Sequence, residues 1–396
     1  MINPDMLKLG STRSGIRELF EFAQQRARIV GADNVFDFSI GNPSVASPPA
    51  VTDAIRSLLT EDPVLIHGYT SAQGLLSTRK AIASHLHKVH GVQAAPEDII
   101  MTCGAAAGVT MTIRALTTGR DDEFLVQAPY FAEYSVFVPA QGGRLVTIAP
   151  DFSTFDLNLP AIEQAITKNT KAVLLNSPNN PSGHVSTRGT LDKLAAILSR
   201  KADEFGHPIF IVSDEPYREL VYGDIDVPYL PNVYANSIVC YSYSKSLSLP
   251  GERIGYVYVP QSAALANQLV PAILGSARAM GYVCAPSLFQ RVIERTVDVL
   301  PDLATYTENR ALLSDGLKAI GYEVVEPDGA FYLFVKAPNG DAAAFSALAK
   351  QDDVLVVPGD AFGCPGYLRI SYCVKRATIE RALQRFARLF EKSTAP

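Results

Sequence analysis

Short runs of apolar residues recur along this chain, and most of them end at glycine, proline or a polar side chain. They lie at residues 99–103, 124–126, 172–175, 209–212, 238–241 and 254–259. Short uninterrupted apolar runs that are bounded by turn-forming residues are typical of strands buried inside a sheet. The pattern therefore predicts a set of buried β-strands in the middle of the chain.

Helices are expected between and around these runs, together with further strands towards the C-terminus. A short strand is expected at 35–40, before the break at Gly41-Asn42-Pro43. The expected later strands lie near 322–326, 330–336 and 354–357. The expected helices lie at about 14–30, within 66–86, at 104–116, along a long connection at 290–321, and near 341–350 and 376–391. Strands that alternate with helical crossovers favour a parallel sheet.

One lysine lies in a segment that is otherwise too apolar for it. Residues 239–256 read VCYSYSKSLSLPGERIGY, so Lys245 follows a buried strand and has Ser242 and Ser244 beside it. Burial disfavours the charged form of lysine, and a neutral amine is what a Schiff base to an aldehyde cofactor requires. Arg253 offers a planar fork of donors suited to a phosphate. The alternative is a surface loop with incidental basic residues.

Two further polar residues stand at the ends of predicted strands. Asp214 follows the strand at 209–212, 34 residues after Asn180 and 31 residues before Lys245. Each interval is long enough for a strand, a crossover and the next strand, so these side chains are expected at one edge of the sheet. A strand-ending aspartate is otherwise commonly a helix cap.

Charge and composition narrow the range of partners. The chain has 35 basic and 40 acidic residues, a net charge of −5, and no basic run of five or more. Nucleic acid and anionic membranes are therefore not expected as partners. The first twenty residues lack the apolar stretch of a secretory signal, and stretches such as 261–277 contain too many polar residues for a membrane span.

The cysteines and histidines predict neither disulfides nor a metal site. The five cysteines are odd in number and have no Cys-x-x-Cys spacing, so we expect reduced thiols and a cytoplasmic protein. His85, His87 and His90 lie close together, but no two are four residues apart. A solvated helix face explains them better than a metal site does.

Several motifs occur in an order that is informative in itself. The Ser-x-Ser-Lys segment is followed by Pro-Gly-x-Arg-x-Gly-Tyr, and Asn-Ser-Pro-Asn-Asn-Pro-Ser-Gly precedes it at 176–183. A tyrosine, a glycine and an arginine, each five residues apart, begin at Tyr69, and Gly-Ala-Phe-Tyr ends at Tyr332. Over nearly the whole chain, this set resembles the class I/II aminotransferases, which are pyridoxal 5'-phosphate (PLP) enzymes of fold type I.

The resemblance implies an α/β fold of the type I PLP-dependent transferases. It predicts a large, mixed and mostly parallel sheet flanked by helices, plus a smaller α+β domain. Residues 48–290 are expected to form the large PLP-binding domain, and residues 1–47 with 291–396 the small domain. It also predicts cis peptide bonds at Ala128–Pro129 and Asn180–Pro181.

The implied activity is transfer of an amino group between an L-amino acid and a 2-oxo acid through a lysine aldimine of PLP. Lys245 would carry the cofactor and act as general base, Asp214 would pair with the pyridine nitrogen, and Tyr217 would lie near the phenolic oxygen. The implied cofactor-binding positions are Gly104, Ala105, Ala106, Phe131, Asn180, Asp214, Tyr217, Ser242, Ser244, Lys245, Arg253 and Tyr69.

Some of these positions carry specific expectations from the resemblance. The small residues at 104–106 would let backbone N–H groups approach the phosphate at a helix N-terminus. Phe131 would stack on the pyridine ring. Tyr69 would cross to the cofactor phosphate of a neighbouring subunit, which implies a homodimer with shared active sites. Core packing is the alternative for Phe131 and Tyr69.

The implied substrate-binding residues are Gly41, Asn180, Arg369 and Arg278. Arg369 would bind the α-carboxylate, because a guanidinium matches a carboxylate with two hydrogen bonds. Arg278 would reach across the dimer to a distal carboxylate, which favours aspartate or glutamate as donor. A surface arginine at a helix end is the alternative for Arg278.

Other functions share parts of this pattern. A PLP-dependent carbon–sulfur β-lyase would use every cofactor residue named above. A PLP-binding transcriptional regulator would need a DNA-binding domain before Gly41, where the sequence has 40 residues. A non-catalytic PLP-binding protein would lack a site residue, and every one of them is present.

Overall fold

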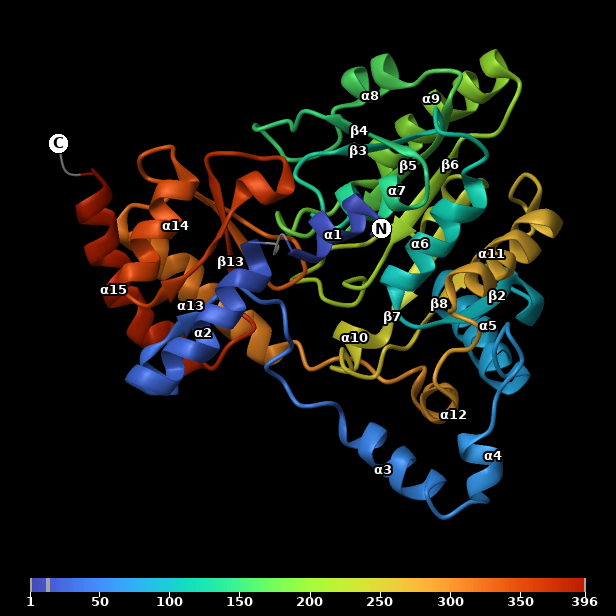
Figure 1. Cartoon of the computed structure of the whole chain (residues 1–396), viewed down its shortest axis with the longest axis horizontal. Coiled ribbons are helices and arrows are strands. Elements are labelled where there is room, and N and C mark those ends of the chain that lie inside the picture. The colour runs from blue at the N-terminus through green and yellow to red at the C-terminus, as the bar shows by residue number, and fades with distance from the viewer. Residues whose placement is uncertain (1, 12–14, 395–396) are drawn as a thin grey trace.

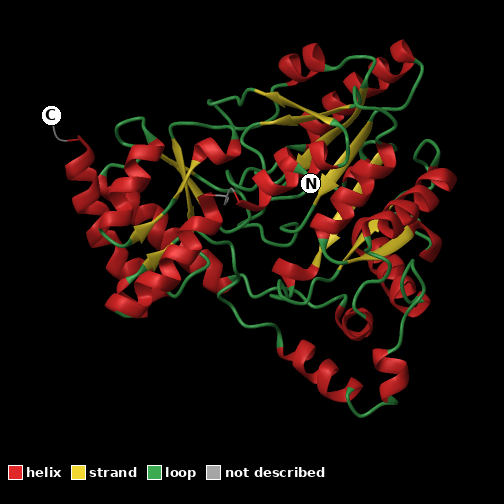
Figure 2. Ribbon diagram, viewed as in Figure 1, coloured by secondary structure: helices red, strands yellow, loops and turns green. Residues whose placement is uncertain are grey.

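The computed structural model describes residues 2–11 and 15–394. It has two bodies of unequal size, each built around its own group of strands (Figures 1 and 2). The smaller body contains α13 (Ala304–Ile320), α14 (Ala342–Gln351) and α15 (Arg376–Thr394). None of the described helices has the length and apolar character needed to cross a membrane.

The larger body is organised around a seven-stranded sheet, and each of the six predicted apolar runs forms one of its strands. Neighbouring strands are parallel except at one strand, β8, which is antiparallel to both of its neighbours. The strand order is β2 (Ile99–Thr102), β8 (Gly255–Tyr258), β7 (Ser237–Ser242), β6 (Phe210–Asp214), β5 (Thr170–Asn176), β3 (Glu123–Gln127) and β4 (Arg144–Ile148). The predicted mixed, mostly parallel sheet is confirmed.

One strand of this sheet is not predicted by the apolar pattern. β4 pairs only with β3, so it is an edge strand, and four of its five residues are at least partly exposed. An edge strand needs fewer apolar residues than a central one, which is why no apolar run marks it.

Helices cover both faces of the large sheet. Strand residues alternate between the faces, as in β2, where Ile100 packs with α6 and α11 while Ile99 packs with α5 and α12. The helices of this body are α3 (Pro49–Leu58), α4 (Pro63–His67), α5 (Leu76–His90), α6 (Ala105–Leu116), α7 (Tyr134–Ala140), α8 (Leu159–Ala165), α9 (Arg188–Phe205), α10 (Tyr243–Ser246), α11 (Ala266–Met280) and α12 (Ser287–Thr296). The α3–α4 segment extends away from the rest (Figure 1).

The smaller body contains an antiparallel sheet, with strand order β12 (Val357–Pro358), β13 (Tyr367–Ser371), β10 (Tyr332–Lys336) and β9 (Val324–Val325). The strand predicted at 354–357 is divided, because β11 (Val354–Leu355) pairs instead with β1 (Phe36–Asp37). The N-terminal helix α2 (Gly15–Val30) packs its apolar side on this region, and α1 (Pro4–Ser11) precedes it.

Two further predicted elements differ from the structure. The connection at 290–321 is two helices, α12 and α13, separated by a segment that contains Pro301. The strand predicted at 35–40 is only the two-residue β1. Directly after Ser242 the chain forms the short helix α10, which the Ser242 hydroxyl caps by accepting a hydrogen bond from the Ser244 N–H.

Candidate active site

A cavity of about 490 Å³ lies between the large sheet, the small sheet and α2. Its lining comes from segments far apart in the sequence, and it includes most of the residues named from the sequence. The predicted residues that line it are Gly41, Ala105, Ala106, Phe131, Asn180, Asp214, Tyr217, Ser242, Ser244, Lys245, Arg253 and Arg369.

Strand register explains why the central residues meet. Asp214 is the last residue of β6, and it lies level with Asn176 of β5 and Cys240 of β7. Because these strands are parallel, the turn after each one emerges at the same edge of the sheet. The turn after β5 carries Asn180, and the helix after β7 carries Lys245.

Lys245 is largely buried and lies close to Gly41 in the cavity. Its Nζ donates a hydrogen bond to the Gly41 carbonyl at 2.6 Å and lies 5.4 Å from the Phe331 ring centroid. Burial lowers the pKa of its amine to about 8, and the nearby Arg253 and Arg369 add to this effect. At pH 7 most of the amine is therefore still protonated, but its neutral fraction is far larger than that of an ordinary lysine.

Asp214 is a buried carboxyl with one satisfied oxygen. The Tyr134 hydroxyl donates to Oδ2 at 2.7 Å, whereas Oδ1 is buried and has no hydrogen-bond partner among the described residues. Burial raises the pKa of Asp214 to about 7, although the hydrogen bond from Tyr134 opposes the shift. Tyr134 was not predicted, because no local pattern links it to a residue 80 positions away.

One end of the cavity has the features of an anion site. The helix α6 begins at Ala105, so its first backbone N–H groups point toward the cavity end. Gly104 has a φ of 85°, and a Cβ there would lie 2.7 Å from a terminal nitrogen of Arg253. The hydroxyls of Ser242 and Ser244 are 2.8 Å apart, and Arg253 donates to Ser244 at 3.4 Å.

The opposite end holds a buried arginine. Arg369 of β13 donates to Asn180 Oδ1 at 3.1 Å and to the Ser39 carbonyl, while its Nε has no partner among the described residues. Its guanidinium lies 4.5 Å from the Tyr332 ring centroid and 5.0 Å from that of Phe362. This arrangement leaves donor capacity for a carboxylate.

Two aromatic groups complete the middle of the cavity. Tyr217 shares a hydrogen bond of 3.1 Å with the Tyr332 hydroxyl, and Phe131 meets Tyr134 edge to face with ring centroids 5.6 Å apart. Gly41 is needed opposite them, because a Cβ at that position would overlap the Tyr332 hydroxyl. The predicted cis bonds at Ala128–Pro129 and Asn180–Pro181 are confirmed, and Ser177–Pro178 is also cis.

Three predicted residues, Gly104, Tyr69 and Arg278, do not line the cavity of their own chain, although Gly104 directly precedes Ala105, which does. Tyr69 is fully exposed, and Arg278 is exposed in the last turn of α11. Both were assigned to the site of a neighbouring subunit, so both assignments stay predictions. The lining also includes residues that the sequence did not indicate, among them Arg17 in the first turn of α2 and Glu133 before α7.

Comparison with known proteins matches this geometry. The family model for aminotransferase class I and II matches residues 33–386. The chain belongs to that family. A crystal structure of an aminotransferase from Eubacterium rectale has 51% sequence identity and a TM-score of 0.97, with 100% of both chains covered.

Two named relatives differ in their substrates. The aspartate aminotransferase of Pyrococcus horikoshii is 30% identical over 96% of this chain and 95% of its own. The aromatic-amino-acid aminotransferase 2 of Thermococcus litoralis is 28% identical over 99% of this chain and 97% of its own. The enzyme is thus a class I/II aminotransferase with the fold of that family.

Proposed function

We propose that this aminotransferase binds PLP on Lys245 and transfers amino groups between L-amino acids and 2-oxo acids, with aspartate or glutamate as preferred donors. The observation that carries the proposal is a largely buried lysine amine in the same cavity as a buried carboxyl, whose Oδ1 has no partner among the described residues. A protonated pyridine nitrogen is a donor of the kind that this oxygen requires.

The rest of the cavity suits the other parts of the cofactor. The turn at 104–106 and Arg253 suit a phosphate, since both helix N-termini and guanidinium groups favour anions. The Phe131 ring suits a stacked aromatic ring. Asn180 and Tyr217 have polar groups for the phenolic oxygen. When bound, PLP supplies an electron sink for the substrate carbanion.

The residues of the chain then have separate tasks. The neutral amine of Lys245 would be the base that accepts the proton from the substrate Cα. The carboxylate of Asp214 would stabilise a positive charge on the pyridine nitrogen of bound PLP. Arg369 binds the α-carboxylate and orients the Cα–H bond for cleavage.

The preference for a dicarboxylic donor rests on arginines around the cavity mouth. Arg17 lines the cavity from α2, and Arg278 is the residue expected to arrive from a second subunit. Either guanidinium would pair with a distal carboxylate.

We also propose a homodimer, in which Tyr69 reaches the phosphate site of its partner. Exposed apolar side chains near Tyr69 support this, since Leu59, Val64 and Leu65 are 60%, 77% and 63% exposed. Clustered exposed apolar residues mark interaction sites. The proposed large domain is 48–290, and the small domain is 1–47 with 291–396. The five free thiols favour a cytoplasmic location.

The test is reduction of the PLP-reconstituted protein with borohydride, followed by peptide mapping. A phosphopyridoxyl adduct is expected on Lys245, and Lys245→Ala should lose the adduct, the visible absorbance and transamination. Lys193→Ala, at an exposed lysine, is the matched control. An adduct on another lysine, with activity retained in Lys245→Ala, would refute the assignment.

The same PLP-reconstituted protein can be used to distinguish an aminotransferase from a carbon–sulfur β-lyase. Cystathionine without any 2-oxo acid should give no pyruvate and no ammonia. Rapid release of both products, with little transamination of aspartate or glutamate, would instead identify a carbon–sulfur β-lyase.

A further inference from the structure

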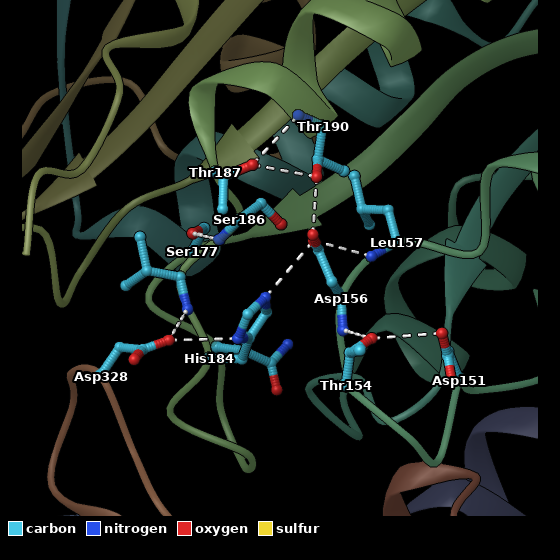
Figure 3. A network of polar contacts seen from close by, with 12 residues as sticks. Asp151, Thr154, Asp156, Leu157, Ser177, His184, Ser186, Thr187, Thr190 and Asp328 are labelled. Carbon is cyan, nitrogen blue, oxygen red and sulfur yellow. Dashed lines mark hydrogen bonds and ion pairs between the residues drawn. The ribbon is translucent and has the colours of Figure 1, made fainter.

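His184 lies between the carboxylates of Asp156 and Asp328 (Figure 3). Its Nδ1 is 3.1 Å from Oδ2 of Asp328, and its Nε2 is 3.3 Å from Oδ1 of Asp156. The exposed fractions of these side chains are 20% for His184, 31% for Asp328 and 20% for Asp156. Solvent therefore screens these ion pairs only in part.

The surroundings keep this imidazole charged. The charged groups that face it are Asp156 and Asp328, and together they raise the pKa of His184 to about 9 although burial opposes the shift. Asp156 also accepts from the Thr190 hydroxyl at 2.6 Å, and Asp328 accepts from the Val185 N–H at 2.9 Å. Both carboxylates are thus held in place for His184.

The three residues belong to three separate segments. Asp156 lies in the loop after β4, and His184 ends the turn at 176–184 that follows β5, which we call the asparagine turn. Asp328 lies between β9 and β10 of the small sheet. His184 therefore connects the large sheet to the small sheet across the side of the cavity.

His184 and Asp328 are each four residues from a residue that lines the cavity, Asn180 and Tyr332 respectively. On one side, the asparagine turn is closed by a hydrogen bond from the Asn179 N–H to the His184 carbonyl at 2.9 Å, and it carries Asn180. On the other side, Asp328 leads through Gly329 to Tyr332, and Gly329 donates to the Gly183 carbonyl at 2.9 Å.

These two sides meet again inside the cavity, where Asn180 accepts a hydrogen bond from Arg369, over which the Tyr332 ring lies. We propose that His184 is a positioning residue that holds the asparagine turn against the Asp328 loop, and so fixes the place where Arg369 receives the substrate carboxylate. His184 touches neither substrate nor cofactor in this role. The inference rests on the proposed role of Arg369.

The pH dependence follows from the sign of the shift. A raised pKa means that the His184 contact is fully present below about pH 6.5, the ordinary histidine value, and is lost as the pH rises through about 9. A purely steric role for the imidazole would not depend on pH in this range.

The first experiment does not need the cofactor. Hydrogen–deuterium exchange is compared among wild type, His184→Gln and Asp192→Asn. The last variant is the control, because Asp192 forms an exposed ion pair with Arg188. Peptides that contain Val185 or Gly329 should exchange about ten-fold faster in His184→Gln than in wild type. In the control, their exchange rates should equal those of wild type. Unchanged exchange in His184→Gln would overturn the proposed connection.

The second experiment measures steady-state kinetics with the PLP-loaded enzyme. At pH 7.5, His184→Gln should raise the KM of the amino donor about ten-fold, with kcat changed less than about three-fold, because substrate placement is lost and the chemistry is retained. At pH 10 the KM difference should shrink to less than about two-fold, since the wild-type imidazole is then neutral.

The outcomes separate this proposal from the proposed function. If exchange is faster but KM is unchanged, or if the KM difference persists at pH 10, the positioning role is wrong. If wild type itself lacks transamination, the proposed function fails while the exchange result still stands. Should His184→Gln not fold, Asp328→Asn replaces it, because an amide oxygen keeps the Val185 hydrogen bond without the charge.

Discussion

The cavity has two walls that are constructed in different ways. The strand-end wall consists of Asn180, Asp214 and Lys245, which follow the carboxyl ends of three adjacent parallel strands. The substrate wall consists of Gly41, Arg369 and the first turn of α2. Its parts come from opposite ends of the chain and meet only through long-range contacts.

In the proposed function, the strand-end wall carries the chemistry and the substrate wall carries the recognition of the substrate. Backbone hydrogen bonds of a buried sheet set the spacing of the strand-end wall, so its groups stay at fixed distances from one another. The substrate wall is positioned by side chains and loops, including the hydrogen bond from Arg369 to Asn180. Changes in the first wall should therefore reduce kcat, and changes in the second should mainly alter KM and substrate choice.

The largest effect is expected from Asp214→Asn. An amide cannot stabilise a positive charge on the ring nitrogen, so kcat should fall about 10³-fold or more. Tyr134→Phe removes only the hydrogen bond to Oδ2 and should cost about ten-fold or less. Single-turnover kinetics with aspartate would measure both, and equal losses in the two variants would contradict a charge-based role.

Arg369→Lys tests the substrate wall. Lysine keeps the charge but loses the planar fork, so KM should rise about 10²-fold for every amino donor while kcat falls less. Arg388→Lys on the exposed side of α15 is the control and should behave as wild type. A loss confined to kcat would place Arg369 in the chemical step instead.

Arg17→Ala, in the substrate wall, and Arg278→Ala, on the exposed end of α11, test which arginine binds a distal carboxylate. The arginine that binds the distal carboxylate should, when replaced, lower kcat/KM for aspartate and glutamate about 10–100-fold, with alanine and phenylalanine little affected. Measuring kcat/KM of both variants with a panel of amino donors shows whether Arg17 of the same chain or Arg278 of a partner chain binds the distal carboxylate. If neither variant discriminates, the dicarboxylate preference is wrong.

The smallest effect is a change in stability. In protein without cofactor, Lys245→Met should raise Tm by about two to four degrees at pH 7, because the buried ammonium is removed. The folded-state pKa of about 8 lies below the ordinary value of 10.5, so the cost is greatest below pH 8. The Tm difference should decrease as the pH rises from 8 to 10.5, and a difference independent of pH would contradict this origin.

The strand-end wall could be predicted from the sequence because its signals are local. An apolar run that ends at Asp214, and another that ends beside Lys245, are each visible within a few residues. The six apolar runs became strands for the same reason, and the ordered motifs indicated the family and the fold.

Only the tertiary structure decided the partners of these residues. Tyr134 lies 80 residues from Asp214, Arg369 lies 189 residues from Asn180, and Arg17 enters the cavity from the N-terminal helix. The pKa of His184 is raised by Asp156 and Asp328, which belong to two different bodies of the molecule. Such contacts have no periodic or local signal, because they arise when separately folded segments pack together.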